Sequence, residues 1–247
     1  MKIAMNSVRV ALLLGFLTTA IVTAQTDDPQ AKADDIVQRV LQQDALRKAQ
    51  LNGYTATRHY IVVNKQRRAE MLVELTCTSD NEKKFTILSE EGSSAIRKHV
   101  FYKMLQEEIE ASRRDTSAST RITPDNYRFQ LLGKEVMEER PAYVLHVTPK
   151  NHSKYLIDGR IWVDATDYSI VRIEGSPARN PSFWTHDVQF VHTYQKVGPF
   201  WFAASTHSTS EIRIFGEAEL TIQNSHYTLN PPDNRTAKAE FPAGVAR

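Results

Sequence analysis

Cys77 is the residue type most able to act as a nucleophile, and it is the single cysteine in the 247-residue chain. A reactive thiol needs a neighbour that stabilises the thiolate, such as a histidine or a helix N-terminus. Cys77 lies instead between Thr76 and Thr78 in an apparent strand, with no histidine nearby in sequence. One cysteine also cannot form an intrachain disulfide. We therefore interpret Cys77 as a buried structural thiol.

Eight histidines raise the question of a metal site. The best local pair is His186 and His192, whose even separation would place both side chains on one face of a strand. Six residues of strand cover about 20 Å, whereas each ligand lies ~2 Å from a zinc ion. His146 and Asp164 lie in different expected strands, so they could bind one metal ion only if the fold happened to bring them together. We expect no metal and no other cofactor.

Glu107, Glu108 and Glu110 form an acidic cluster in which paired carboxylates could transfer protons. Basic residues such as Lys103 and Arg113 lie nearby in the same expected helix, which is typical of a solvated charged face. The chain contains no Gly-x-Ser-x-Gly elbow, no glycine-rich phosphate loop and no His-Glu-x-x-His helix. We expect a protein that is not an enzyme.

Residues 1–24 are typical of a cleavable secretory signal peptide. Lys2 and Arg9 supply a positive start, residues 10–21 are apolar, and residues 22–24 have the small-residue pattern of a cleavage site. The apolar run would reach about 18 Å as a helix, short of the ~30 Å hydrocarbon core. A transmembrane anchor is therefore the weaker interpretation. We expect cleavage after Ala24 and a soluble protein in the periplasm.

The mature chain would carry no net charge. Cleavage removes Lys2 and Arg9 and no acidic residue, which leaves 29 basic and 29 acidic residues. The chain then has no general attraction for nucleic acid or for anionic membranes. Residues 25–247 fit one domain, since single all-β domains commonly reach this size. Partners must be recognised by shape and by apolar surface.

Two helices are expected to position these side chains. The first begins at Asp34 and runs to about Leu51, with an apolar face formed by Ile36, Val37, Val40 and Leu41. The second covers about residues 95–112 after a serine cap at residues 93–94. At ~100° per residue its apolar side chains fall on two opposite sides: Ile96, Val100 and Met104 on one, and Phe101, Leu105 and Ile109 on the other. The second helix should therefore contact protein or ligand on more than one side.

The rest of the chain is predicted to be β. Eleven strands are expected at residues 54–63, 68–79, 84–89, 127–137, 142–148, 160–164, 168–175, 183–194, 200–210, 212–223 and 226–229. Turn residues recur between them at the spacing of a meandering sheet or barrel. The predicted fold class is mainly β (α+β), with one large curved antiparallel sheet and helices against it.

Several of these strands are apolar on both faces. Tyr143, Leu145 and Val147 point one way and Val144 points the other, and residues 161–163 and 200–202 show the same pattern. A half-buried sheet would alternate with polar residues. Helices would cover one face, and the second cover is either protein, as in a sandwich or barrel core, or a lipid.

In its order of elements and in several strings, the chain resembles the LolA-like periplasmic lipoprotein carriers and outer-membrane lipoprotein-sorting proteins. The resemblance covers nearly all of the chain after the signal peptide. The strings are NYRF (126–129), LLGKE (131–135), AYVLHVTPK (142–150), GRIWVD (159–164), FWF (200–202) and FPAGV (241–245). No string is diagnostic alone, and the resemblance rests on their order after a signal peptide.

The resemblance implies an incomplete, strongly curved antiparallel β-barrel whose concave face is covered by helices. An apolar cavity between them would accept acyl chains. The candidate lipid-binding residues are Val100, Met104, Leu105, Leu145, Val147, Trp162, Trp184 and Trp201. Carriers of this family hold a lid with an arginine near the end of an early strand. The comparable residues 75–80 contain none, and Arg67, Arg68 and Arg97 are the available substitutes.

The function implied is that of a monomeric extracytoplasmic carrier. It would shield the acyl chains of lipidated proteins or lipids during transfer toward the outer membrane, with transient inner- and outer-membrane protein partners. Two alternatives remain: a lipid- or lipoprotein-sensing regulatory module of the same fold, and an unrecognised extracytoplasmic enzyme. Fold alone does not choose among them.

Overall fold

The computed structural model describes residues 29–113, 119–180, 185–213 and 216–230. The predicted signal peptide, Trp184 and residues 241–245 lie outside these ranges. Within them, none of the helices combines the length and the apolar character that a membrane crossing requires.

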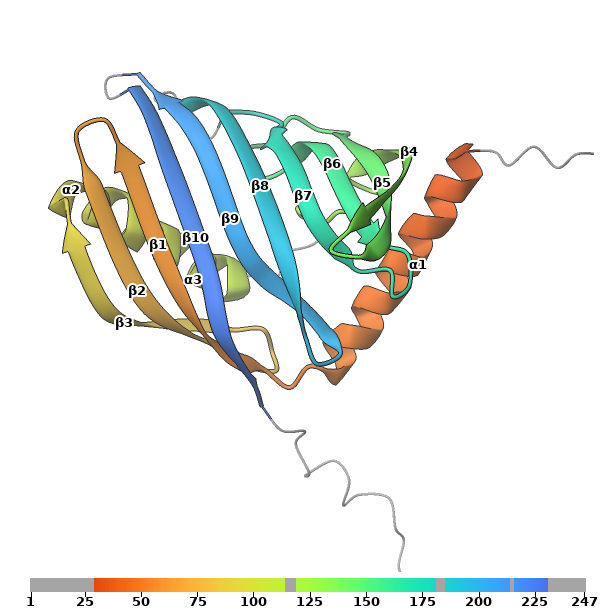
Figure 1. The fold of residues 1–247 in the computed structure, drawn as a ribbon, viewed down its shortest axis with the longest axis horizontal. Helices are drawn as coiled ribbons and strands as arrows, with labels where there is room; N and C mark the ends of the chain where they lie inside the picture. Colours follow the sequence, from red (N-terminus) through yellow and green to blue (C-terminus); the bar gives the residue numbers. More distant parts are fainter. Residues whose placement is uncertain (1–28, 114–118, 181–184, 214–215, 231–247) are drawn as a thin grey trace, which may run out of the picture.

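Ten antiparallel strands form one sheet (Figure 1). They are β1 (Tyr54–Asn64), β2 (Arg68–Cys77), β3 (Lys83–Gly92), β4 (Tyr127–Met137), β5 (Arg140–Pro149), β6 (Ile157–Asp164), β7 (Ile170–Pro177), β8 (Thr185–Val197), β9 (Phe200–Ile212) and β10 (Gly216–Leu229). Their spatial order is β3-β2-β1-β10-β9-β8-β7-β6-β5-β4. In the described residues no ladder joins β3 to β4, so the barrel is incomplete and mainly β, as predicted.

The prediction of eleven strands was wrong by one. The last two expected strands, residues 212–223 and 226–229, are one strand, β10. A register shift opposite Thr55 and Thr57 gives β10 an extra residue beside His226, whose φ is 51°. Such a bulge interrupts the alternation of a strand without ending its pairing, which explains why the sequence pattern indicated a turn there.

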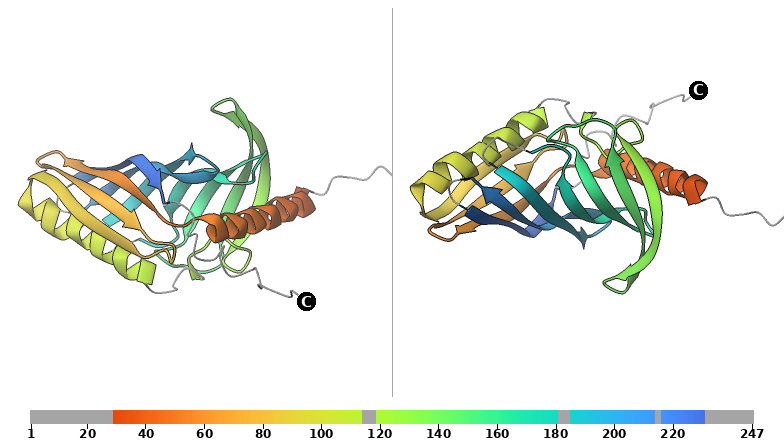
Figure 2. Two further views of the ribbon diagram at one scale, coloured as in Figure 1. Left: turned by 90° about the horizontal axis from the view of Figure 1, so that it is seen from below. Right: turned by 90° about the horizontal axis from the view of Figure 1, so that it is seen from above.

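Two helical segments accompany the sheet, and the second lies between its two edge strands in sequence. Helix α1 (Pro29–Gln50) precedes β1, and a continuous helical segment of α2 (Ser94–Ile96), a π-helical turn η1 (Arg97–Phe101) and α3 (Tyr102–Arg113) follows β3. Because β3 and β4 are consecutive in sequence and lie at opposite edges, the chain between them must cross the sheet. Figure 2 shows α1 beside the β4 end and α3 beside the β1–β3 end.

Both helical segments pack on the same face, which we call the inner face. A row of directly paired residues crosses nine strands on this face: Met71, Tyr60, Ile222, Thr206, His192, Ile173, Ile161, Leu145 and Leu131. Residues of α1 pack with Leu145 at one end, and residues of η1 and α3 pack with Met71 at the other. The expected cover of one face by helices is therefore confirmed.

Two glycines mark a sharp bend of the sheet. Gly159 of β6 pairs with Gly175 of β7, next to the buried, inner-facing Val147 of β5. A Cβ on Gly159 would meet the carbonyl oxygen of Glu174 at 2.0 Å, so only glycine fits. Backbone atoms of the next strand thus lie where an inner-facing side chain would be, and the sheet bends toward the helices at this point.

Two expectations about the helices were wrong. Helix α1 begins at Pro29 and not at Asp34, in keeping with the preference of proline for the first turn. The second helical segment does not present two opposite apolar sides, because η1 adds a residue to one turn. Ile96, Phe101 and Leu105 consequently share one buried side. Ser93 takes the N-cap position there, without a side-chain capping hydrogen bond.

Candidate functional site

The inner face carries an apolar cluster at the α1 end. Ala33, Ile36, Val37 and Val40 of α1 are buried against residues of β4–β7. Leu145 and Val147, two candidate lipid-binding residues, lie in this cluster and are fully buried. Complete burial against α1 makes them part of the folded core in this state.

A second apolar cluster lies at the α3 end. Phe101 and Leu105 pack on Tyr60, Met71 and Val73, with Val100 and Met104 at the margin and partly buried. Three candidate lipid-binding residues, Val100, Met104 and Leu105, are thus brought together between α3 and strands β1, β2 and β10. They lie far along the sheet from Leu145 and Val147, at the other end of the row defined above.

Charged groups join α3 to the sheet inside this second cluster. Arg58 of β1, 8% exposed, donates to Glu108 of α3 at 2.7 Å and to Asn224 of β10 at 2.7 Å. Lys83 donates to the other oxygen of Glu108, also at 2.7 Å. The guanidinium of Arg58 lies 5.5 Å from the ring centre of Phe85. One carboxylate on the helix is therefore held by two cations of the sheet.

The pKa directions agree with this geometry. Burial alone raises the pKa of the Glu108 carboxyl, but Lys83 and Arg58 reverse this and hold it below its usual value. For Arg58, burial alone lowers the pKa, but the attraction of Glu108 outweighs this and raises the pKa above its usual value. Both groups are consequently ionised at neutral pH, although the pair is largely removed from water.

Sequence reasoning missed this ion pair. Glu108 was assigned to a solvated charged face, which is wrong, because its side chain is 28% exposed and contacts two cations. Arg67, Arg68 and Arg97 were considered for holding the helix. Arg97 pairs with Glu90 of β3, and Arg58, which was not considered, pairs with Glu108. A signal existed in β1, where Arg58 occupies an inner-facing position between Ala56 and Tyr60 in an otherwise apolar alternation.

Between the two clusters the inner face is partly exposed and of mixed polarity. Phe190, Leu220 and Ile222 remain only partly buried. At the centre His192 and Thr206 face each other, and the His192 Nδ1 lies 2.7 Å from the Thr206 hydroxyl. Burial lowers the pKa of His192, so the ring is neutral at pH 7. The most accessible part of the inner face therefore lies where the two helical segments leave it.

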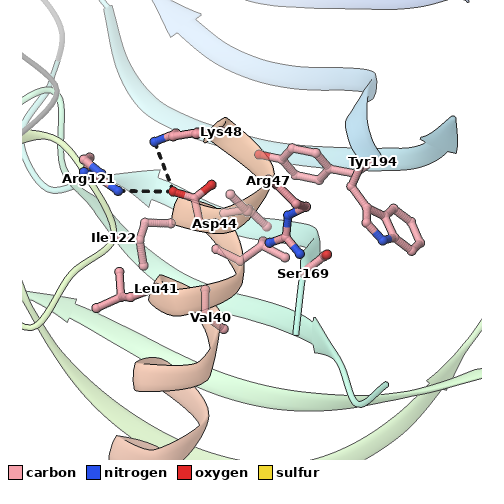
Figure 3. Close-up of a pocket in the computed structure, with 12 residues that line it drawn as sticks. Val40, Leu41, Asp44, Arg47, Lys48, Arg121, Ile122, Ser169 and Tyr194 are labelled. Atoms are coloured by element: carbon pink, nitrogen blue, oxygen red, sulfur yellow. Dashed lines mark hydrogen bonds and ion pairs between the residues drawn. The ribbon is translucent and has the colours of Figure 1, made fainter. Parts of the chain in front are cut away.

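A cavity of about 280 Å³ lies between the C-terminal half of α1 and strands β7–β9 (Figure 3). Its apolar lining comes from Val40, Leu41, Ile122, Ile170 and Ile173, with Tyr194 and Trp201 on the sheet side. Its polar lining is Asp44, Arg47, Lys48, Arg121 and Ser169. The cavity is at the lower end of the ~300–1,000 Å³ typical of small-molecule sites.

The tryptophans do not form one site. Trp201 lines this cavity and a smaller one of about 60 Å³ beside Arg140 and Asp164, and its indole donates to Asp167. Trp162 lies in a cluster with Val144, on the face opposite Leu145, and does not line the cavity, although Trp201 packs against the margin of that cluster. Its ring is 5.1 Å from the guanidinium carbon of Arg160.

The residues with potential for other chemistry are dispersed. Cys77 is buried, and burial raises the pKa of its thiol. His186 and His192 do not share a face as expected, because β8 has an extra residue between His186 and Gln189, where Asp187 has φ 52°. In the described ranges no group of three or more metal-ligating side chains is close enough to hold an ion.

Comparison with known proteins gives fold-level likeness. No family model and no curated protein matches the chain. Similar solved structures include a DUF1329 family protein from Desulfovibrio piger (12% identity, 83% of this chain and 95% of that one, TM-score 0.44). A putative outer membrane lipoprotein-sorting protein domain from Vibrio parahaemolyticus has 14% identity, 83% and 96% coverage and TM-score 0.43. A LolA superfamily protein from Nitrosomonas europaea has 10% identity, 82% and 96% coverage and TM-score 0.36.

These neighbours include the family that the sequence strings resemble. At such identities and TM-scores the likeness concerns the fold, and it assigns no cargo, partner or site residue to this chain.

Proposed function

We propose that this protein is an extracytoplasmic carrier that shields acyl chains of lipids or lipidated proteins on the inner face of its sheet. The observation that carries the proposal is the division of this face. Its two ends are covered by separate helical segments, and apolar side chains in its middle, such as Phe190 and Ile222, stay partly exposed. A folded domain gains about 25 cal/mol for each Å² of apolar surface removed from water, so an incompletely covered face favours an apolar ligand.

The mobile cover in this proposal is α3. Its own apolar contacts are Leu105 and the margin residue Met104, next to Val100 of the preceding η1, and its ionic anchor is Glu108. Movement of α3 away from β1 would expose the cluster around Tyr60 and Met71. It would also widen the uncovered middle of the inner face, between α3 and the cavity beside α1. The candidate lipid-binding residues carried forward are therefore Val100, Met104 and Leu105, together with Trp201 at the cavity. Trp162, on the opposite face, is not retained.

The signal-like residues 1–24 and the mature chain's lack of net charge fit such a carrier. An acyl chain in water costs about 0.8 kcal/mol per CH₂, so crossing an aqueous compartment needs a protein that covers the chain and releases it. Helix α3 could supply such a cover. Its ion pair through Glu108 fixes its position on the sheet, and moving the helix away would leave the hydrogen bonds between the strands intact.

Lipid extraction and mass spectrometry of gently purified protein test the proposal. We expect co-purifying lipid, and uptake of a fluorescent fatty acid by delipidated protein. The variant Leu220→Gln, on the inner face, should weaken uptake about tenfold or more, since burial of one leucine is worth ~1.5–3 kcal/mol. Leu132→Gln, at a side chain 51% exposed on the edge strand β4, is the matched control and should leave uptake unchanged.

An absence of both co-purifying lipid and fatty-acid uptake would overturn the proposal. Lipid uptake without transfer of lipidated protein between membranes, combined with capture of a signalling protein, would instead support the sensing module.

A further inference from the structure

We propose that the cavity between α1 and β7–β9 binds the negatively charged headgroup of an amphiphile, with the apolar chain continuing along the inner face. This inference rests on the proposed function and assigns it a ligand class, an anionic lipid, and a direction of binding.

Positive side chains outnumber negative ones around the cavity. Arg47, Lys48 and Arg121 line it, with Asp44 as the single carboxylate among its lining residues. Asp44 already pairs with Lys48 at 3.0 Å and with Arg121 at 3.1 Å, as the dashed lines in Figure 3 show. The lining therefore keeps an excess of two positive charges, which an anion can neutralise.

Arg47 is the cation best placed to bind that anion. It is half-buried, and it donates to the backbone carbonyl oxygen of Asp167 at 3.2 Å, which fixes the side chain without neutralising it. The Asp167 carboxylate does not line the cavity and is engaged by Lys196, by the Trp201 indole and by the backbone of Ser169. A guanidinium has five N–H donors, so Arg47 retains donors for a phosphate or carboxylate.

Ser169 supplies an independent indication of a polar ligand. Its residue is 1% exposed, it lines the cavity, and its hydroxyl oxygen is buried without a hydrogen-bond partner among the described residues. Buried polar groups are nearly always satisfied, and an orphan hydroxyl at a cavity wall is explained by a ligand that bonds to it. Figure 3 draws Arg47, Ser169 and Tyr194 among the residues around this cavity.

The far side of the cavity leads onto the inner face. Ile173 lines the cavity and pairs directly with His192, which pairs with Thr206 and so with Ile222. Tyr194 stands at the same junction, and burial raises the pKa of its phenol to about 12, which keeps the hydroxyl protonated. A chain attached to a headgroup beside Arg47 would therefore extend over Ile173 toward the partly exposed apolar middle of the sheet.

Binding of short-chain soluble lipids to the delipidated full-length protein tests this assignment. Titration calorimetry would compare dihexanoyl phosphatidic acid, dihexanoyl phosphatidylcholine and inorganic phosphate. We expect the anionic lipid to bind about tenfold or more tightly than the zwitterionic one, because charge-assisted hydrogen bonds are worth ~1.5–3 kcal/mol. Inorganic phosphate should bind more weakly than the anionic lipid, since it lacks the apolar chain.

Variants localise the effect. Arg47→Gln and Ser169→Ala should each reduce affinity for the anionic lipid about fivefold to fiftyfold and leave affinity for the zwitterionic lipid unchanged. Lys32→Gln, which removes an exposed charge of the same helix away from the cavity, should change neither. Ser169→Ala removes only the hydroxyl oxygen and leaves the residues of α1 unchanged. It therefore tests the site even if Arg47→Gln perturbs that helix.

Three outcomes would overturn the inference. Equal binding of both lipids, unaltered by Arg47→Gln, would remove the headgroup site and leave the carrier proposal standing. Phosphate binding as tightly as the anionic lipid would identify a site for free anions. Absence of any lipid binding would defeat the carrier proposal and this inference with it.

Discussion

The α1 end and the α3 end of the inner face are both apolar, yet they hold their helices differently. Helix α1 is buried through Ala33, Ile36, Val37 and Val40, and its ion pairs with described residues are exposed or lie at its C-terminal half. Helix α3 adds a largely buried carboxylate, Glu108, held by Arg58 and Lys83. Apolar contact is non-directional, whereas an ion pair depends on geometry and on protonation. In the proposed function, this difference separates a permanent part of the core from a cover that can be released.

The largest expected effect comes from damage at the α1 end. Leu145→Ala removes a side chain with no exposed surface and should lower the free energy of unfolding by about 3–4 kcal/mol in chemical denaturation. Leu132→Ala, at a half-exposed leucine, is the control and should change stability by less than about 0.5 kcal/mol. A loss below about 1 kcal/mol for Leu145→Ala would show that this end is not the stable core.

A smaller and local effect is expected from Glu108→Gln. Loss of the charge leaves Arg58 buried without its anionic partner, and we expect α3 to open more easily by about 2 kcal/mol, below the ~3–5 of a fully enclosed pair because Glu108 keeps some solvent contact. Hydrogen exchange should show faster exchange in α3 and unchanged exchange in α1. Glu107→Gln, whose carboxylate is 60% exposed, is the matched control and should change neither helix. Equal acceleration in both helices would contradict the separation of the two ends.

The smallest effect is expected from acidification. The folded-state pKa of Glu108 lies below its usual value, so its stabilisation is complete above about pH 4.3 and is lost as the pH falls through the folded pKa. Near the cavity Asp167 has a pKa of about 2: burial alone would raise it, and hydrogen bonds from Lys196 and the Trp201 indole lower it. Loss of its contribution begins below about pH 3.9, the usual pKa of an aspartate, and therefore at a lower pH than the loss for Glu108.

Hydrogen exchange at pH 7, 4 and 3, corrected for intrinsic rates, measures this difference. Protection of α3 should fall first in the native protein, and Glu108→Gln should remove that pH dependence. Protection of α1 falling before that of α3 would contradict the assignment.

Much of the fold was predictable because alternation and turn residues report burial directly. Three strands of the first meander, the apolar face of α1 and the position of Leu145 on the face opposite Val144 followed from residue patterns. The errors fall where one extra residue in a helix or strand changes which side the following side chains face. The π turn at Arg97–Phe101, the bulge beside Asp187 and the bulge beside His226 each rotate or reverse the side chains that follow. Patterns that assume a constant period cannot locate such insertions.

The candidate site was less predictable, because it depends on contacts between distant residues. Arg58 and Glu108 are 50 positions apart, and Arg47 reaches Asp167 across 120. Apolar type alone placed Leu145 and Trp162 in one group, although they face opposite sides of the sheet. The placement of charges relative to the inner face is a property of strand register, which the sequence pattern did not determine for these residues.

The strand order also has a consequence for how the chain reaches this state. All neighbouring strands are consecutive in sequence except β1 and β10, where Tyr54 pairs with Leu229. The first meander, β1–β3, is synthesised early and keeps one edge of β1 unpaired until the last described strand is made. Closing so long a loop is slow relative to forming hairpins. Joining of the two meanders is therefore the expected late step of folding, and the open β1 edge is the surface most exposed to mispairing before it.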